Sequence, residues 1–237
     1  MANIITKNIP NTITCCNLIS GCTATAFAFS GQLNTAFLFI VWGAVFDFFD
    51  GMTARLLNVS SPIGKELDSL ADCITFGFAP STMIFYELNI INYPSFAEPL
   101  RDILPFSAFI MAAFSALRLA KFNLDERQAT SFIGMPTPAN ALFWASLLVG
   151  GGRILESSVY ALPIILVLMA ACCYILISEI PMFALKFKQW GWKGNEIKYI
   201  FIITCIPLLI TSGISSFAII IAWYVILSIY VNIKSNK

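Results

Sequence analysis

The sequence predicts an all-α, polytopic membrane protein. Of its 237 residues, 58% are hydrophobic and 11% are charged, and the mean hydropathy is +0.81. Soluble domains carry about 25% charged residues, so this chain is too apolar for that class. Apolar stretches recur along its whole length. We therefore expect one membrane-embedded domain over residues 1–237, without a separate soluble module.

Eight apolar segments are candidate transmembrane helices. A crossing helix needs roughly 20 predominantly apolar residues. The fifth and seventh segments fall short of that length, so six or seven crossings stay open as alternatives. The segments are about residues 13–30, 33–57, 68–88, 103–122, 138–150, 159–178, 198–211 and 214–232.

Local signals mark several of these segments in chain order. The first contains the polar residue Asn17, which suits either a nucleotide contact or an interhelical hydrogen bond. Residues 60–64 break the chain between the second and third segments, because they combine two serines with a proline and a glycine. A glycine and two prolines at 134–138 are expected to shape a kinked or re-entrant start of the fifth. Between the sixth and seventh, residues 186–198 are predicted to form a cytoplasmic loop with aromatic anchors rather than an interfacial element.

Basic residues predict the orientation of the chain. With eight crossings, twelve of the 14 Lys and Arg residues lie on one side and only Arg101 and Arg153 on the other. An excess of Lys and Arg marks the cytoplasmic side of a membrane protein. Both termini are therefore predicted to be cytoplasmic. The twelve residues are Lys7, Arg55, Lys65, Arg118, Lys121, Arg127, Lys186, Lys188, Lys193, Lys198, Lys234 and Lys237.

Composition excludes several classes of function. Histidine is absent, so Ser-His-Asp hydrolysis and phosphohistidine chemistry are excluded, and a general base must be a carboxylate, Lys, Tyr or Cys. The net charge of +1 predicts no broad basic face for nucleic acid. The seven cysteines show no CxxC spacing and lie in apolar runs, which indicates small buried side chains rather than a zinc site or disulfides.

Four aspartates stand at helical spacings where the second and third segments adjoin. Asp47 and Asp50 are three residues apart, and Asp68 and Asp72 are four apart, so each pair shares one helix face. The short connection at 60–64 makes the two helices antiparallel neighbours, and the acidic faces can then meet. Carboxylates at bilayer depth are costly, and converging ones repel each other unless cations neutralise them.

Metal chemistry explains this arrangement best. Hard oxygen ligands suit Mg²⁺ or Mn²⁺, and two ions about 4 Å apart would clamp phosphate oxygens. Gly51 and Ala54 lie on the same face as the first acid pair and leave room for a bulky ligand, and Arg55 offers a planar cation for a phosphate. Two alternatives are helix-end acids solvated at the interface and a divalent-cation channel or transporter. Neither explains the accompanying glycine, alanine and arginine.

The pattern Asp-x2-Asp-Gly-x2-Ala-Arg-x8-Gly-x3-Asp-x3-Asp over residues 47–72 resembles the signature of the CDP-alcohol phosphatidyltransferases at every fixed position. The resemblance implies a core of six transmembrane helices, to which this chain adds two C-terminal spans, and a homodimer with a cytoplasm-facing cavity. It also implies a dinuclear metal site. Family members transfer the phosphatidyl group of a CDP-linked lipid to an alcohol and release CMP.

The resemblance assigns roles by position. The metal ligands would be Asp47, Asp50, Asp68 and Asp72. Asp72 would also be the catalytic general base. The CDP-lipid would be bound by Gly51, Ala54, Arg55, Gly64 and Lys65, with Gly64 shaping the turn beneath it.

Other segments indicate the acceptor alcohol. Residues 10–21, 65–72, 118–123 and 132–141 together resemble the membrane-integral phosphatidylserine synthases, which use CDP-diacylglycerol and L-serine. Lys121 is a mild departure, since Arg is more usual there.

Three residues at the end of the fourth segment would form the acceptor side of the site. Arg118 and Lys121, with Asn123 nearby, would bind either the serine carboxylate or the lipid diphosphate. Snorkelling basic residues at a membrane boundary are the structural alternative. Glycerol 3-phosphate and inositol derivatives are the alternative acceptors. No organelle signal is visible, so a bacterial cytoplasmic membrane is the expected location.

Overall fold

The computed structural model describes residues 4–59, 61–125, 132–183, 191–192 and 195–235. Nearly all of them are helical. The third predicted segment, residues 68–88, covers the end of one α-helix, a π-helical segment and most of a second α-helix, and each of the other segments overlaps one α-helix. The α-helices are α1 (Ile4–Phe29), α2 (Leu33–Leu56), α3 (Pro62–Asp72), α4 (Ala79–Ile90), α5 (Phe109–Leu124), α6 (Thr137–Ser157), α7 (Ala161–Ile177), α8 (Glu196–Ser212) and α9 (Ser216–Ser235). The basic residues Arg127, Lys186, Lys188, Lys193 and Lys237, which count toward the predicted orientation, lie outside the described residues.

The structure confirms an all-α membrane protein. Four of the described stretches are long and apolar enough to cross a membrane, and α7 is a shorter apolar helix. The four are Asn8–Phe29, Leu33–Leu56, Leu104–Leu124 and Glu196–Lys234. The last of these turns at Gly213–Ser215 into the separate helices α8 and α9. The number of eight crossings stays a prediction.

Several predicted boundaries differ from the helices of the structure. The third segment was expected to begin near residue 68, but α3 begins at Pro62. The fifth was expected to end near residue 150, but α6 continues to Ser157. A Cβ added to Gly150 would lie only 2.8 Å from Ser215 Cβ, in the turn between α8 and α9. The first segment was expected to begin near residue 13, whereas α1 begins at Ile4 and continues through Pro10.

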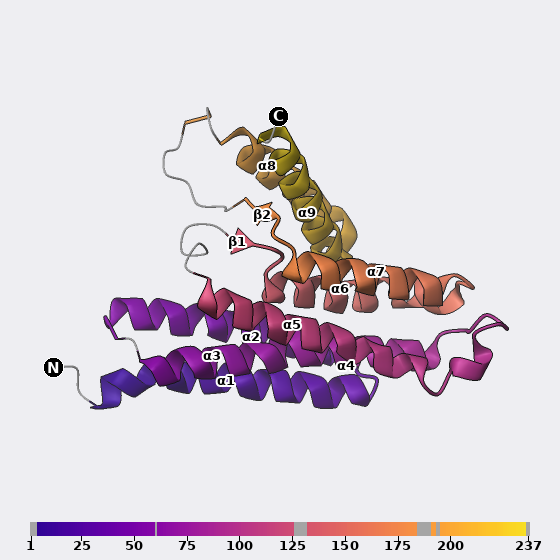
Figure 1. Cartoon of the computed structure of the whole chain (residues 1–237), viewed down its shortest axis with the longest axis horizontal. Coiled ribbons are helices and arrows are strands. Elements are labelled where there is room, and N and C mark those ends of the chain that lie inside the picture. Colours follow the sequence, from indigo (N-terminus) through magenta and orange to yellow (C-terminus); the bar gives the residue numbers. More distant parts are fainter. Residues whose placement is uncertain (1–3, 60, 126–131, 184–190, 193–194, 236–237) are drawn as a thin grey trace.

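The helices form a bundle with an attached hairpin. In Figure 1, α1 to α5 lie lengthwise beside one another, α6 and α7 run along one side of them, and α8 and α9 lean away at an angle. The core between them is apolar and includes the fully buried Ile40, Phe76, Met83 and Trp144. Helices α1 and α2 make the most extensive contact, which brings the start of α1 beside the end of α2.

The turn between α2 and α3 is defined by local hydrogen bonds. Asn58 adopts a positive φ of 51°, and the Val59 amide donates to the Ala54 carbonyl (3.0 Å), which closes the end of α2. The Ser61 hydroxyl then accepts a hydrogen bond from the Gly64 amide (3.0 Å) and caps the start of α3. The chain reverses at this turn, but α2 and α3 make little direct contact with each other, and α1 packs against both. The prediction that the two acidic helices are packed neighbours is therefore wrong, although their acids still meet.

A π-helical segment, Cys73–Phe78, joins α3 to α4 without a break and begins directly after Asp72. Helices α1 and α2 approach it through glycines. A Cβ added to Gly21 of α1 would lie 2.7 Å from Thr75 Cα, and one added to Gly43 of α2 would contact the Thr75 side chain. The Thr75 hydroxyl donates to the Asn17 carbonyl of α1 (3.0 Å). Three helices therefore meet at Thr75, next to the last predicted aspartate.

A short strand pair closes the bundle near the ends of α5 and α7. Strand β1 (Phe132–Ile133) pairs antiparallel with β2 (Pro181–Met182). Gly134 follows β1 with a φ of 72°, and its amide donates to the Ile180 carbonyl (2.9 Å). A Cβ at this glycine would lie 2.8 Å from the Leu176 carbonyl oxygen, so only glycine fits. Helix α6 then begins at Thr137, directly after Pro136.

Packing at Thr75 leads to a stability prediction. Replacing Gly21 by Ala places a methyl group against the Thr75 backbone, which cannot move aside as a side-chain end can. We expect the free energy of unfolding to fall by about 1–3 kcal/mol. Thermal unfolding in detergent, followed by size-exclusion chromatography, measures the effect. Gly51→Ala is the matched control, because no atom lies within 4 Å of its added Cβ. Equal melting temperatures for both variants would contradict the prediction.

Candidate metal and substrate site

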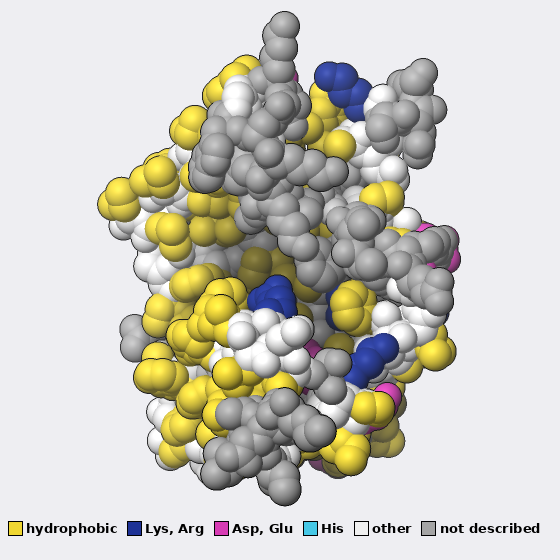
Figure 2. Space-filling view, turned by 90° about the vertical axis from the view of Figure 1, so that its left-hand side faces the viewer, with side chains coloured by type: hydrophobic (Ala, Val, Ile, Leu, Met, Phe, Trp, Pro, Cys, Tyr) yellow, Lys and Arg dark blue, Asp and Glu magenta, His cyan; other side chains and the backbone are white. Residues whose placement is uncertain are grey.

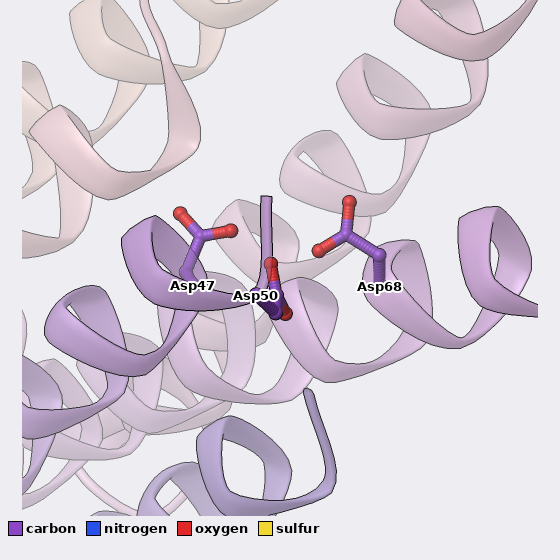
Figure 3. A group of neighbouring side chains, drawn as sticks. All are labelled: Asp47, Asp50 and Asp68. Atoms are coloured by element: carbon purple, nitrogen blue, oxygen red, sulfur yellow. The ribbon is translucent and has the colours of Figure 1, made fainter. Parts of the chain in front are cut away.

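Three of the four predicted aspartates come together at one end of the bundle. Asp47 and Asp50 project from α2 and Asp68 from α3, and one carboxylate oxygen of each lies within 4.8 Å of the others. Figure 3 shows the three side chains turned toward a common space. In the part of the chain that the structure describes, none of them forms an ion pair with Lys or Arg. A divalent cation therefore fits the donor set, since it supplies the charge that the protein does not.

Asp72 lies apart from this group of three. It is one helical turn further along α3, 9% exposed, and near enough to all three other aspartates to interact with them electrostatically. Its Oδ1 accepts a hydrogen bond from Asn17 Nδ2 (3.1 Å). The predicted cluster of four ligands is thus present as three close carboxylates and one buried neighbour that a side-chain amide orients.

Helix α1 contributes two polar side chains that contact the acids. Besides Asn17, Thr14 donates from its hydroxyl to Asp50 Oδ2 (2.7 Å). Sequence reasoning gave Asn17 an interhelical hydrogen bond as one of two options, and the structure confirms that option. It missed Thr14. The available signal was the spacing, because the two polar residues stand three apart on one face of an apolar helix.

A cavity of about 670 Å³ opens beside the acids, between α1, α2 and α3. Asp50 and Asp68 line it, as do the predicted donor-binding residues Gly51, Ala54, Gly64 and Lys65. Nothing lies within 4 Å of a Cβ added to Gly51, so that position faces open space. The structure therefore brings these four residues and two of the acids around one hollow.

Arg55 and Lys65 make hydrogen bonds to the backbone. Arg55 is exposed, and its Nε donates to the Gly51 carbonyl of its own helix (3.0 Å). Lys65 Nζ donates to the Asn123 carbonyl of α5 (2.9 Å), and Asn123 Nδ2 donates to Ser69 Oγ (2.7 Å). Asn123, which was predicted to bind the acceptor, therefore connects α5 to α3.

A second cavity, of about 380 Å³, lies between the ends of α5 and α7. Arg118 and Lys121 line it together with residues near β1 and the end of α7. Arg118 is 6% exposed, and its guanidinium lies over the Phe122 ring, 4.9 Å from the ring centroid. Figure 2 looks onto this end of the molecule, where Lys and Arg side chains border a hollow.

Comparison with known proteins agrees with this geometry. A sequence model of the CDP-alcohol phosphatidyltransferase family matches residues 7–230. The chain belongs to this family. The acids of α2 and α3 are the residues that carried the resemblance in the sequence, and the fold places them at one site. Family membership also means that the two cavities belong to a phosphatidyltransferase.

Several relatives carry the name CDP-diacylglycerol–serine O-phosphatidyltransferase. The protein from Bacillus subtilis is 42% identical over 130 residues, which is 55% of this chain and 69% of that protein. The protein from Methanocaldococcus jannaschii is 32% identical over 227 residues, which is 95% of this chain and 93% of that protein. The one from Helicobacter pylori strain 26695 is 34% identical over 135 residues, or 56% and 54% of the two chains. The alignment thus spans about half of the Helicobacter protein.

The acidic group predicts tight binding of a divalent cation. Replacing Asp68 by Asn removes one of three converging charges, and we expect the affinity for Mn²⁺ to fall at least about tenfold. Titration of the purified protein with Mn²⁺, followed by electron paramagnetic resonance of the free ion, measures this without turnover. Glu66→Gln is the control, because this exposed carboxylate is on the same helix but outside the group of three. Unchanged Mn²⁺ affinity in Asp68→Asn would refute the site.

Proposed function

We propose that this protein transfers the phosphatidyl group of CDP-diacylglycerol to the hydroxyl of L-serine and releases CMP. One observation carries the proposal: three carboxylates converge to within 4.8 Å, and the buried Asp72, one turn further along α3, is oriented by Asn17 outside that group. A buried carboxylate beside a metal-binding group is placed to act as a general base. The family and the names of the relatives support the same reaction.

The donor occupies the cavity between α1, α2 and α3. Gly51 and Ala54 leave room for the CDP moiety, and Gly64 and Lys65 border it from α3. The acyl chains extend into the bilayer along α2, where Phe48 is 62% exposed. Arg55 turns from its own helix toward the diphosphate.

The metal site supplies charge to this reaction. Asp47, Asp50 and Asp68, with Asp72, would hold two Mg²⁺ or Mn²⁺ ions. When bound, such ions neutralise the diphosphate and make CMP a better leaving group. Thr14 keeps the Asp50 carboxylate oriented by its hydrogen bond.

The transfer is a direct displacement. Asp72, oriented by Asn17, accepts the proton of the serine hydroxyl. The serine oxygen forms a bond to the phosphatidyl phosphorus, and the bond from that phosphorus to the CMP oxygen breaks. CMP leaves with the electron pair of that bond. No phosphoenzyme is needed, because the serine oxygen attacks the phosphatidyl phosphorus directly.

The membrane setting completes the proposal. The protein crosses the membrane eight times, with a six-helix core and the C-terminal pair α8 and α9, and works as a homodimer. Both termini and the site face the cytoplasm, in a bacterial cytoplasmic membrane. The positive-inside bias of the sequence supports this orientation.

The proposed reaction is tested by CMP release from purified, detergent-solubilised protein given CDP-diacylglycerol and Mn²⁺. We expect release to require L-serine and to be matched by a new serine-containing lipid. Release with glycerol 3-phosphate or an inositol compound instead would keep the family reaction and change the acceptor. No release with any alcohol, together with Mn²⁺ flux into vesicles, would favour a cation transporter.

The base assignment has its own test. Asp72→Asn keeps the shape of the side chain and an oxygen to accept from Asn17, but it cannot take up the proton. We expect kcat to fall by about 10²- to 10⁴-fold. Binding of CDP-diacylglycerol, measured by thermal stabilisation, serves as the control for folding. Full turnover in this variant would show that Asp72 is not the base.

A steric prediction concerns donor binding. Gly51→Ala fills open space in the first cavity without disturbing the fold. We expect KM for CDP-diacylglycerol to rise about tenfold, equivalent to about 1.4 kcal/mol, while KM for serine and the melting temperature stay the same. A variant with wild-type KM for the donor would exclude Gly51 from the donor site.

A further inference from the structure

The cavity between α5 and α7 is lined by charges of both signs. Its cations, Arg118 and Lys121, lie one turn apart on α5. Its acids are Asp125, which directly follows α5, and Glu179, which lies just beyond the end of α7. Two positive and two negative side chains therefore border one hollow. A site built only for a diphosphate or a phosphorylated alcohol would gain nothing from the two acids, since like charges repel.

We infer that this cavity recognises the zwitterionic head of an α-amino acid, with Arg118 and Lys121 receiving its carboxylate and Asp125 and Glu179 its ammonium group. The inference rests on the proposed function and deepens it by naming the residues that select the acceptor. Asp125 and Glu179 were not singled out by sequence reasoning, because they come from segments far apart in the chain that only the fold brings to one cavity.

The burial and hydrogen bonding of Arg118 support this inference independently. The side chain is 6% exposed, yet its Nε has no hydrogen-bond partner among the residues that the structure describes. A buried guanidinium with an unused donor is unfavourable unless an anion completes it. Its planar donor fork matches a carboxylate in a two-point contact. The cavity wall beside Arg118 is therefore where the acceptor carboxylate belongs.

Size and position agree with a small amino acid. The volume of about 380 Å³ is at the lower end of the range for ligand pockets, about 300–1,000 Å³. Helix α5 packs against the π-helical segment that directly follows Asp72, with Gly77 against Ser115, one turn before Arg118. A carboxylate held by Arg118 would therefore keep a short amino acid near the end of α3 that carries Asp72, the proposed base.

The wall of the cavity is held by backbone contacts. Lys121 Nζ lies 3.5 Å from the Ile177 carbonyl oxygen at the end of α7. Gly134, next to the lining residue Ile133, packs against the Leu176 and Ser178 carbonyls of the same helix end. The first contact joins α5 to the end of α7, and the second joins the segment after β1 to the same helix end.

The test pairs each charged residue with the substrate group that it contacts. Glu179→Gln and Asp125→Asn are expected to raise KM for L-serine about three- to tenfold, with kcat and KM for CDP-diacylglycerol nearly unchanged. Lys121→Gln should do the same. Two competitive inhibitors separate the groups: 3-hydroxypropionate lacks the ammonium, and ethanolamine lacks the carboxylate.

The two inhibitors give opposite expectations. Inhibition by 3-hydroxypropionate should weaken in Lys121→Gln and not in Glu179→Gln, and inhibition by ethanolamine should show the reverse. Asp102→Asn is the control, because this exposed carboxylate lies in the connection before α5, outside the cavity. Its KM for serine should match that of the wild type.

Failure of this inference differs from failure of the proposed function. Serine-dependent CMP release by the wild type, with unchanged KM for serine in both Glu179→Gln and Asp125→Asn, would overturn the inference alone. A rise in KM for CDP-diacylglycerol with KM for serine unchanged would also overturn it, and would assign the cavity to the lipid diphosphate. If the wild type uses an acceptor without an amino-acid head, the proposed function and the inference both fall.

Discussion

Repulsion between carboxylates at a membrane surface is the constraint on which the rest of this structure depends. Asp47, Asp50 and Asp68 lie within 4.8 Å of one another with no ion pair from the described part of the chain. The mutual repulsion of these carboxylates is unfavourable by itself, so helix packing elsewhere must keep them close together. The close contact of α1 and α2 with Thr75 does this, because Gly21 and Gly43 let three helices approach one turn away from the acids.

Because of this packing, different helices contribute different functional groups to the site. Helix α1 supplies the hydrogen-bond donors Thr14 and Asn17, and α2 and α3 supply the acids. Helix α5 supplies Arg118 to the second cavity. Each cavity has walls from different helices, and loop residues complete both, with Asn58 and Ser61 at the first and Asp125 and Glu179 at the second.

Sequence reasoning reached the acidic faces because a helical period fixes which residues lie together. It did not reach the separation of Asp72 from the other acids, where Asp72 accepts a hydrogen bond from Asn17 of α1. Nor did it reach the length of α6, where the turn at Ser215 packs against Gly150. The hydrogen bond from Asn123 to Ser69 was also missed. Contacts between distant segments are involved in all three.

The segment Cys73–Phe78 should tolerate no insertion or deletion, whereas the connections between helices can vary in length. Winding in a π-helical segment differs from that in the α-helices on either side. Deleting one residue there would rotate α3 against α4 by about 100°. Either the acids of α3 would then turn away from α2, or the buried face of α4 around Met83 would turn toward lipid. Homologous sequences that keep this chemistry should therefore align through this segment without gaps, and insertions should collect between α4 and α5.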